Sequence, residues 1–173
     1  MIGRRRLLAL CALALPVAAG ACGWEPLYAD PQTATASEAL RAVKVTPISE
    51  RVGQQLELAL RASLNPNDIA TKPLYRLDVT LRTTLRDLGI QSQGLGTRGE
   101  VDVNADYKLI ELASNKVEQS GSIHTSDSFD ILANGYTTLV AEDDAKRRCV
   151  EDLRREIVAR LTLLLQNKEP IAS

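Results

Sequence analysis

Aromatic side chains are scarce in this chain. Its 173 residues include one Trp, one Phe and four Tyr, which together make 3% of the sequence. Hydrophobic residues of all kinds still reach 45%, so a core can form, but Leu, Val, Ile and Ala must build it. The length suits one domain once a targeting segment is set aside.

An excess of basic charge is also missing. The formal net charge is −1, and beyond Arg4, Arg5 and Arg6 the chain holds 18 basic against 22 acidic side chains. A nucleic-acid partner normally requires a basic surface that neutralises phosphates. The composition therefore predicts no nucleic-acid partner.

Catalytic and metal-binding motifs are absent from the sequence. There is no G-x-S-x-G, H-E-x-x-H, C-x-x-C or Walker-type loop. The one histidine, His124, is predicted on the polar side of a strand and lacks the partners of a metal site. Asp143 and Asp144 are predicted at the start of a helix, where acids complement the helix dipole. We expect no catalytic residue, metal or cofactor; an enzyme site assembled from scattered polar residues is the alternative.

No apolar run reaches the length of about 20 residues that a membrane-spanning helix needs. The longest run, Leu7 to Ala19, covers 13 residues and follows three arginines. This anatomy predicts an export signal at residues 1–21, removed from the mature protein, and no transmembrane helix afterwards.

The three cysteines have different expected fates. Cys11 leaves with the signal, and Cys149 falls on an apolar helical stripe, where a free thiol acts as a small hydrophobe. Cys22 follows Ala-Gly-Ala, which fits a lipobox and predicts lipidation of Cys22 by an N-acyl diacylglycerol group with palmitate-type chains. Ordinary cleavage at an A-x-A site would leave Cys22 free, and a disulfide with Cys149 is also open.

The mature chain is predicted to contain a lipidated N-terminus and tether at 22–41, one domain at 42–168, and a tail at 169–173. The hydrophobic periods predict strands and helices in the order β-α-β-β-β-α. The first predicted strand is at 43–46 and is ended by Pro47, and a helix follows from the N-cap Ser49 to Leu64. Three more strands are predicted at 75–85, 100–109 and 117–125, and the last helix is predicted at 138–166. The fold class is α+β: a two-layer sandwich with two amphipathic helices on one face of a four-stranded, mostly antiparallel sheet.

The alternation within strands also predicts which side chains point inward. The inward set is Tyr75, Leu77, Val79, Leu81, Leu85, Val101, Val103, Ala105, Tyr107, Leu109, Val117 and Ile123, and Gly121 can join it. On the outer face, Arg76, Arg82 and Arg86 of one strand can pair with Glu100, Asp102 and Asp106 of the next. A solvated face with modest ion pairs is the simpler interpretation of these charges.

Four stretches resemble the LPS-assembly lipoprotein LptE family of alphaproteobacteria. "CGWEPLY" is similar to the family's "CGF-x-PLY" start, and "ISERVGQQLELAL" to its "I-x-x-R-x-x-Q-x-L-x-x-x-L". Thr97-Arg98 and "YTTLVAEDDAKRR" follow in the family's order. The sequence departs from the pattern at Trp24, where Phe is usual, and in the polar "SDSFDILANG".

The resemblance implies two helices on a four-stranded sheet, and a role that is not enzymatic. It implies an outer-membrane lipoprotein, anchored by lipid on the periplasmic side, that plugs an LptD-like β-barrel, helps it assemble and assists delivery of lipopolysaccharide to the outer leaflet. Gly23 fits sorting to the outer membrane. Because arginine binds phosphate bidentately, Arg82, Arg86 and Arg98 are the candidate lipopolysaccharide-binding residues. The alternative is an auxiliary lipoprotein of a lipid-transporting ABC system.

Overall fold

The computed structural model describes residues 37–90 and 96–168. The expected signal peptide, Cys22 and the tail at 169–173 lie outside these residues. Every element described below belongs to one compact unit, Thr35–Ser173. A helical turn at 37–41 precedes β1 (Val43–Val45), α3 (Arg51–Leu64), β2 (Tyr75–Ile90), β3 (Gly96–Glu111), β4 (Val117–Asp130) and α4 (Gly135–Asn167).

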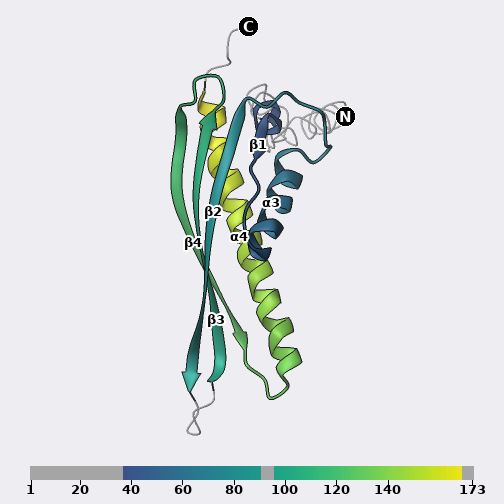
Figure 1. Cartoon of the computed structure of the whole chain (residues 1–173), viewed down its shortest axis with the longest axis vertical. Helices are drawn as coiled ribbons and strands as arrows, with labels where there is room; N and C mark the ends of the chain where they lie inside the picture. Colours follow the sequence, from purple (N-terminus) through teal and green to yellow (C-terminus); the bar gives the residue numbers. More distant parts are fainter. Residues whose placement is uncertain (1–36, 91–95, 169–173) are drawn as a thin grey trace, which may run out of the picture. The chain divides into compact units, whose positions relative to one another are not determined.

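The four strands form one sheet in the order β1-β2-β3-β4. β1 runs parallel to β2, with Val43 opposite Tyr75, and β2, β3 and β4 form an antiparallel meander. Both helices cover the same face of the sheet (Figure 1). The predicted α+β class, element order and mostly antiparallel sheet are therefore confirmed.

The core lies between the sheet and the two helices. Odd-numbered residues of β2 and β3 point toward the helices, and Leu77, Val101, Val103, Ala105 and Leu109 are fully buried. The helices contribute stripes at helical spacing: Val52, Leu56, Leu60 and Leu64 from α3, and Cys149, Leu153, Ile157, Leu161 and Leu165 from α4. Truncating one such leucine to alanine typically destabilises a fold by about 2–5 kcal/mol.

Two glycines make room for the few aromatic rings. Tyr107 lies across the strand from Gly121, and a Cβ on Gly121 would approach its ring to 3.0 Å. Phe129 lies opposite Gly99 in the same way, and there the approach would be 2.4 Å. Each ring fills the space that a side chain on the neighbouring strand would take, so both rings are buried.

The strands extend further than predicted, and two expected core residues are exposed. Leu85 is 51% exposed and Val117 is 48% exposed. β2 is about 50 Å long whereas α3 is about 21 Å long, so α3 cannot cover the far half of β2, where Leu85 lies. The register between β3 and β4 shifts between Leu109 and Ile110. Val117 therefore lies opposite Ile110, out of phase with the inward residues of β4.

Both helix starts differ from the prediction. The residue before α3 is Glu50, in the left-handed region at φ 68°, without a side-chain capping bond, so the prediction of Ser49 as N-cap is wrong. α4 begins at Gly135, earlier than predicted, because Asn134 caps it by accepting a hydrogen bond from the Tyr136 amide at 3.0 Å.

The earlier start of α4 also changes the interpretation of the acidic pair at 143–144. Asp143 and Asp144 lie beyond the second turn of α4, so they do not stabilise its N-terminus. Asp143 instead approaches Arg51 of α3 at 3.4 Å. Within the described residues, no helix has both the length and the apolar character needed to cross a bilayer.

Candidate binding surface

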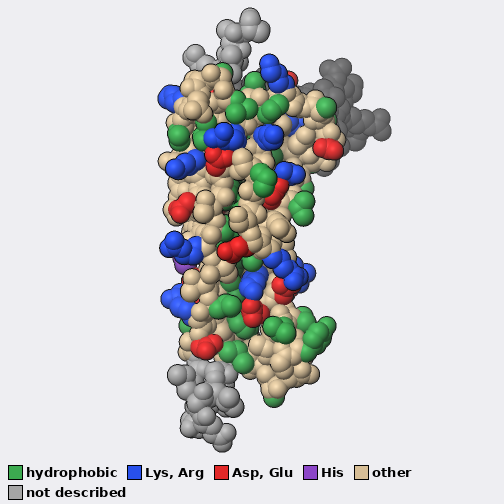
Figure 2. Space-filling model, in the orientation of Figure 1, with side chains coloured by type: hydrophobic (Ala, Val, Ile, Leu, Met, Phe, Trp, Pro, Cys, Tyr) green, Lys and Arg blue, Asp and Glu red, His purple; other side chains and the backbone are tan. Residues whose placement is uncertain are grey.

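The sheet face turned away from the helices carries the polar side chains of the meander. We call it the open face; it consists of the even-numbered residues of β2 (76–86), β3 (98–108) and β4 (120–130). These residues share a face because side chains alternate along a strand and the three strands keep register over this stretch. In the view of Figure 2, basic and acidic side chains are interspersed over the surface, without a large region of one sign.

Asp102 is at the centre of the open face, and its side chain is only 6% exposed. Arg86 Nε donates a hydrogen bond to Asp102 Oδ2 at 2.6 Å, and Arg86 Nη2 forms an ion pair with the same oxygen at 2.6 Å. The same Nη2 lies 3.2 Å from Glu100 Oε2. Arg86 is therefore bound by two carboxylates of β3, as the cross-strand pairing predicted for this residue.

His124 completes this cluster from β4. Its Nδ1 lies 3.1 Å from Asn104 Oδ1, and its Nε2 lies 3.5 Å from Asp102 Oδ1. Asp102 Oδ1 is buried and has no hydrogen-bond partner among the described residues. Both ring nitrogens of His124 thus lie near oxygen atoms of β3 side chains.

The other predicted arginines differ from Arg86 in what they contact. Arg76 pairs with Asp78 of its own strand at 3.1 Å, so the predicted cross-strand pair of Arg76 is wrong. Arg98 donates from Nη2 to Ser128 Oγ at 2.7 Å. Arg82 is exposed, and within residues 37–90 and 96–168 it makes no hydrogen bond or ion pair.

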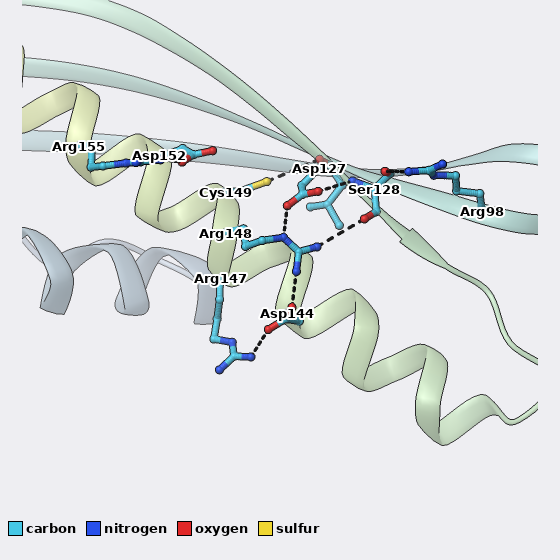
Figure 3. A network of polar contacts seen from close by, with 10 residues as sticks. Arg98, Asp127, Ser128, Asp144, Arg147, Arg148, Cys149, Asp152 and Arg155 are labelled. Carbon is cyan, nitrogen blue, oxygen red and sulfur yellow. Dashed lines mark hydrogen bonds and ion pairs between the residues drawn. The ribbon is translucent and has the colours of Figure 1, made fainter.

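Ser128 links the open face to α4 (Figure 3). Its carbonyl oxygen accepts a bond from Arg148 Nη2 at 3.5 Å, and Arg148 also pairs with Asp127 of β4 and Asp144 of α4. The hydrogen bond with Asp127, together with the charges of both aspartates, raises the pKa of the Arg148 guanidinium. This network fixes the far end of β4 against α4.

The three candidate arginines form a row along the strands. Arg82 and Arg86 are four residues apart on β2, which corresponds to about 13 Å, and Arg98 lies beyond Arg86 on the neighbouring strand. Arg82 and Arg98 keep donors accessible to an anionic ligand, whereas Arg86 is occupied by carboxylates. Such a row can contact a large ligand with several anionic groups better than one small anion.

The sequence predicted which residues lie on the open face but missed the cluster at its centre. Asn104 and His124 are directly opposite in the register, and that register could not be read from the strand sequences. The alternation had placed both residues on the polar side, which was the only available signal. No group of three or more His, Cys, Asp and Glu side chains suited to a metal ion occurs in the part of the chain that the structure describes.

No protein-family model matches this sequence, and no curated protein matches it either. Solved structures do match. A lipoprotein from Caulobacter crescentus, described as putative, superposes with a TM-score of 0.65 at 18% identity, over 79% of this chain and 99% of the other.

Two further structures are similar. A minor lipoprotein from Acinetobacter baumannii has a TM-score of 0.52 at 15% identity, over 71% of this chain and 92% of its own. An uncharacterized lipoprotein B from Nitrosomonas europaea has a TM-score of 0.50 at 17% identity, over 75% and 90%. At these identities the comparisons establish a shared fold, and the proteins that share it are named lipoproteins.

Proposed function

We propose that this chain is a non-catalytic outer-membrane lipoprotein, anchored through an N-acyl diacylglycerol group on Cys22, on the periplasmic side of the membrane. In this role it binds and plugs an LptD-like β-barrel, assists its assembly, and aids delivery of lipopolysaccharide to the outer leaflet. The fold shared with proteins named lipoproteins supports the anchor. The sequence resemblance to the LptE family supports the partner.

The observation that carries the proposal is the polar open face. No helix of the described residues covers this sheet face (Figure 1), and the interior of a large outer-membrane barrel is itself polar. Mixed charges on this face allow polar contacts with a barrel wall. The exposed guanidinium of Arg82 and the outer donors of Arg98 provide phosphate-binding groups along the same face.

Lipopolysaccharide binding is tested with two variants and one shared control. We expect Arg82→Gln and Arg98→Gln to weaken binding of lipopolysaccharide by the domain, about three- to tenfold each, since each removes a charge-assisted contact. Arg160→Gln is the control, because Arg160 lies on α4 and pairs with Glu156 at 2.7 Å. Equal affinities for all three variants at the same salt concentration would exclude the arginine row as the lipopolysaccharide site.

The partner is tested by purifying the full chain from the envelope through a C-terminal tag. Co-purification with a large outer-membrane barrel, together with an acylated N-terminus found by mass analysis, is the expected result. Co-purification with an inner-membrane permease complex would instead favour an auxiliary lipoprotein of a lipid-transporting ABC system.

A further inference from the structure

β4 lies at the edge of the sheet and has a free side. It pairs with β3 along its length, and no strand of the described residues pairs with its other side. An edge of this kind presents unpaired amide and carbonyl groups that another strand can bind.

The direction of these groups follows from one contact at the far end of β4. The Ser128 carbonyl accepts a bond from Arg148, which belongs to α4 rather than to β3, so it points toward the free side. Backbone groups in a strand alternate in direction, so the amides and carbonyls of Ser122, His124 and Ser126 also point toward the free side. The amides of Ile123 and Thr125 point toward β3.

The usual protections of an edge strand are missing from the middle of β4. Natural edges are commonly blocked by lysine, proline or a bulge, whereas residues 119–130 of β4 keep a regular register and include neither residue. At positions 120, 122, 126 and 128, where the backbone groups point toward the free side, the residues are serines with short side chains. Among the described residues, Arg148 bonds to this part of the edge at its far end, through Asp127 and Ser128.

A groove of about 680 Å³ follows this unprotected stretch. Residues 122–125 form one wall, and side chains of α4 that include Asp152, Arg155 and Arg160 form the other. Arg155 pairs with Asp152, and Arg160 pairs with Glu156, so these side chains are held along the helix. An edge strand beside a helix is the geometry in which other domains bind an extended peptide as an added strand.

We propose that this groove binds one extended polar segment of the barrel partner as a fifth strand of the sheet, paired with β4. This rests on the proposed function, since the barrel supplies the segment. The helix wall carries both signs of charge, which suits a segment with both acidic and basic side chains. A second copy of the chain fits less well, because it would bring its own α4, which packs over β4, into the same space.

The first test is amide hydrogen exchange on the full lipidated chain, alone and in complex with the purified barrel. In the free chain the amides of Ser122 and His124 should exchange fast, and those of Ile123 and Thr125 slowly. In the complex, exchange at Ser122 and His124 should slow at least about tenfold. An alternating change of this kind is specific to strand pairing, because general burial would not select every second amide.

The second test compares two variants at one outward position. Ser122→Pro removes the outward amide without removing a bond to β3, a substitution that edge strands tolerate, and should weaken barrel binding about tenfold. Ser122→Ala keeps the amide, removes only the hydroxyl, and should bind within about twofold of the unmodified chain. Thermal unfolding of both variants checks that they fold, and the exchange test does not depend on either.

Each unexpected outcome of these two tests contradicts either the strand addition or the proposed function. A stable complex without alternating protection, or equal binding by both variants, would overturn strand addition and leave the proposed function in place. Absence of any complex with the barrel would overturn the proposed function and the barrel-derived strand together. Alternating protection that grows with concentration in the chain alone would identify a second copy as the occupant and overturn the proposal.

Discussion

Replacing Arg86 by glutamine should destabilise the domain, although its side chain is 58% exposed. The reason lies in its partner, because the Asp102 side chain is only 6% exposed and receives one hydrogen bond and one ion-pair contact from Arg86. Removing one member of such a pair leaves a buried carboxylate without its main donor. Arg86→Gln therefore tests whether this arginine is structural.

The magnitude follows from the contacts. A hydrogen bond to a charged group contributes about 1.5–3 kcal/mol, the ion pairs of Arg86 Nη2 with Asp102 and Glu100 add to it, and solvent around Arg86 screens part of the total. We expect the free energy of unfolding to fall by about 2–3 kcal/mol, with a Tm lower by roughly 6–12 °C for a domain of this size. Urea unfolding followed by circular dichroism should show a lower midpoint at an unchanged slope.

Arg82→Gln is the matched control, because Arg82 lies on the same face of the same strand without a hydrogen bond or ion pair among the described residues. Its free energy of unfolding should change by less than about 0.5 kcal/mol. The double variant Arg86→Gln/Asp102→Asn should recover at least about 1 kcal/mol, since it also removes the buried charge. If Arg86→Gln and Arg82→Gln are equally stable, Asp102 does not depend on Arg86 and the reasoning is refuted.

Three further expectations concern packing, a thiol and acid. Gly99→Val should lower the free energy of unfolding, measured in urea, by about 1–3 kcal/mol, because the valine side chain would meet the ring of Phe129. Gly135→Ala is the control and should be neutral, because its new Cβ meets nothing within 4 Å. Equal effects of the two variants would contradict this packing. Burial raises the pKa of the Cys149 thiol, so a thiol reagent at pH 8 should modify it only after unfolding, and rapid modification of the folded domain would contradict its burial. The hydrogen bond from Lys168 lowers the pKa of Glu118 below its ordinary 4.5; the stabilisation is therefore complete above pH 4.5 and lost as the pH falls through the lowered pKa. Glu118→Gln should reduce the loss of Tm in acid, and an identical pH profile would argue against this ion pair.

Sequence periodicity predicted the fold because the apolar residues obey simple repeats. Alternation over Tyr75 to Val79 and spacing by four from Cys149 to Leu161 both survive in the buried core. The errors occur where a local pattern depends on something distant. Leu85 alternates correctly, but its exposure depends on the length of a helix elsewhere in the chain.

The binding surface was less accessible to sequence reasoning. The pairing of Arg86 with Asp102 could be predicted, because one hairpin connects their strands. The position of His124 beside Asn104 required the register of a further strand, which a bulge near Leu109 shifts. The unpaired backbone amides and carbonyls of β4 could not be predicted, because the order of the strands in the sheet decides which strand lies at the edge.

The parallel pairing of β1 has a consequence for the order of folding. β1 contributes only the pairs from Val43–Tyr75 to Val45–Leu77, and about thirty residues separate the two strands. β2, β3, β4 and α4 follow one another through short connections, so their contacts close smaller loops and should form first. β1, although synthesised before them, must wait for β2, and we expect its amides to be the first in the sheet to lose exchange protection during partial unfolding. Equal protection of β1 and β3 would show that the whole domain opens as one unit.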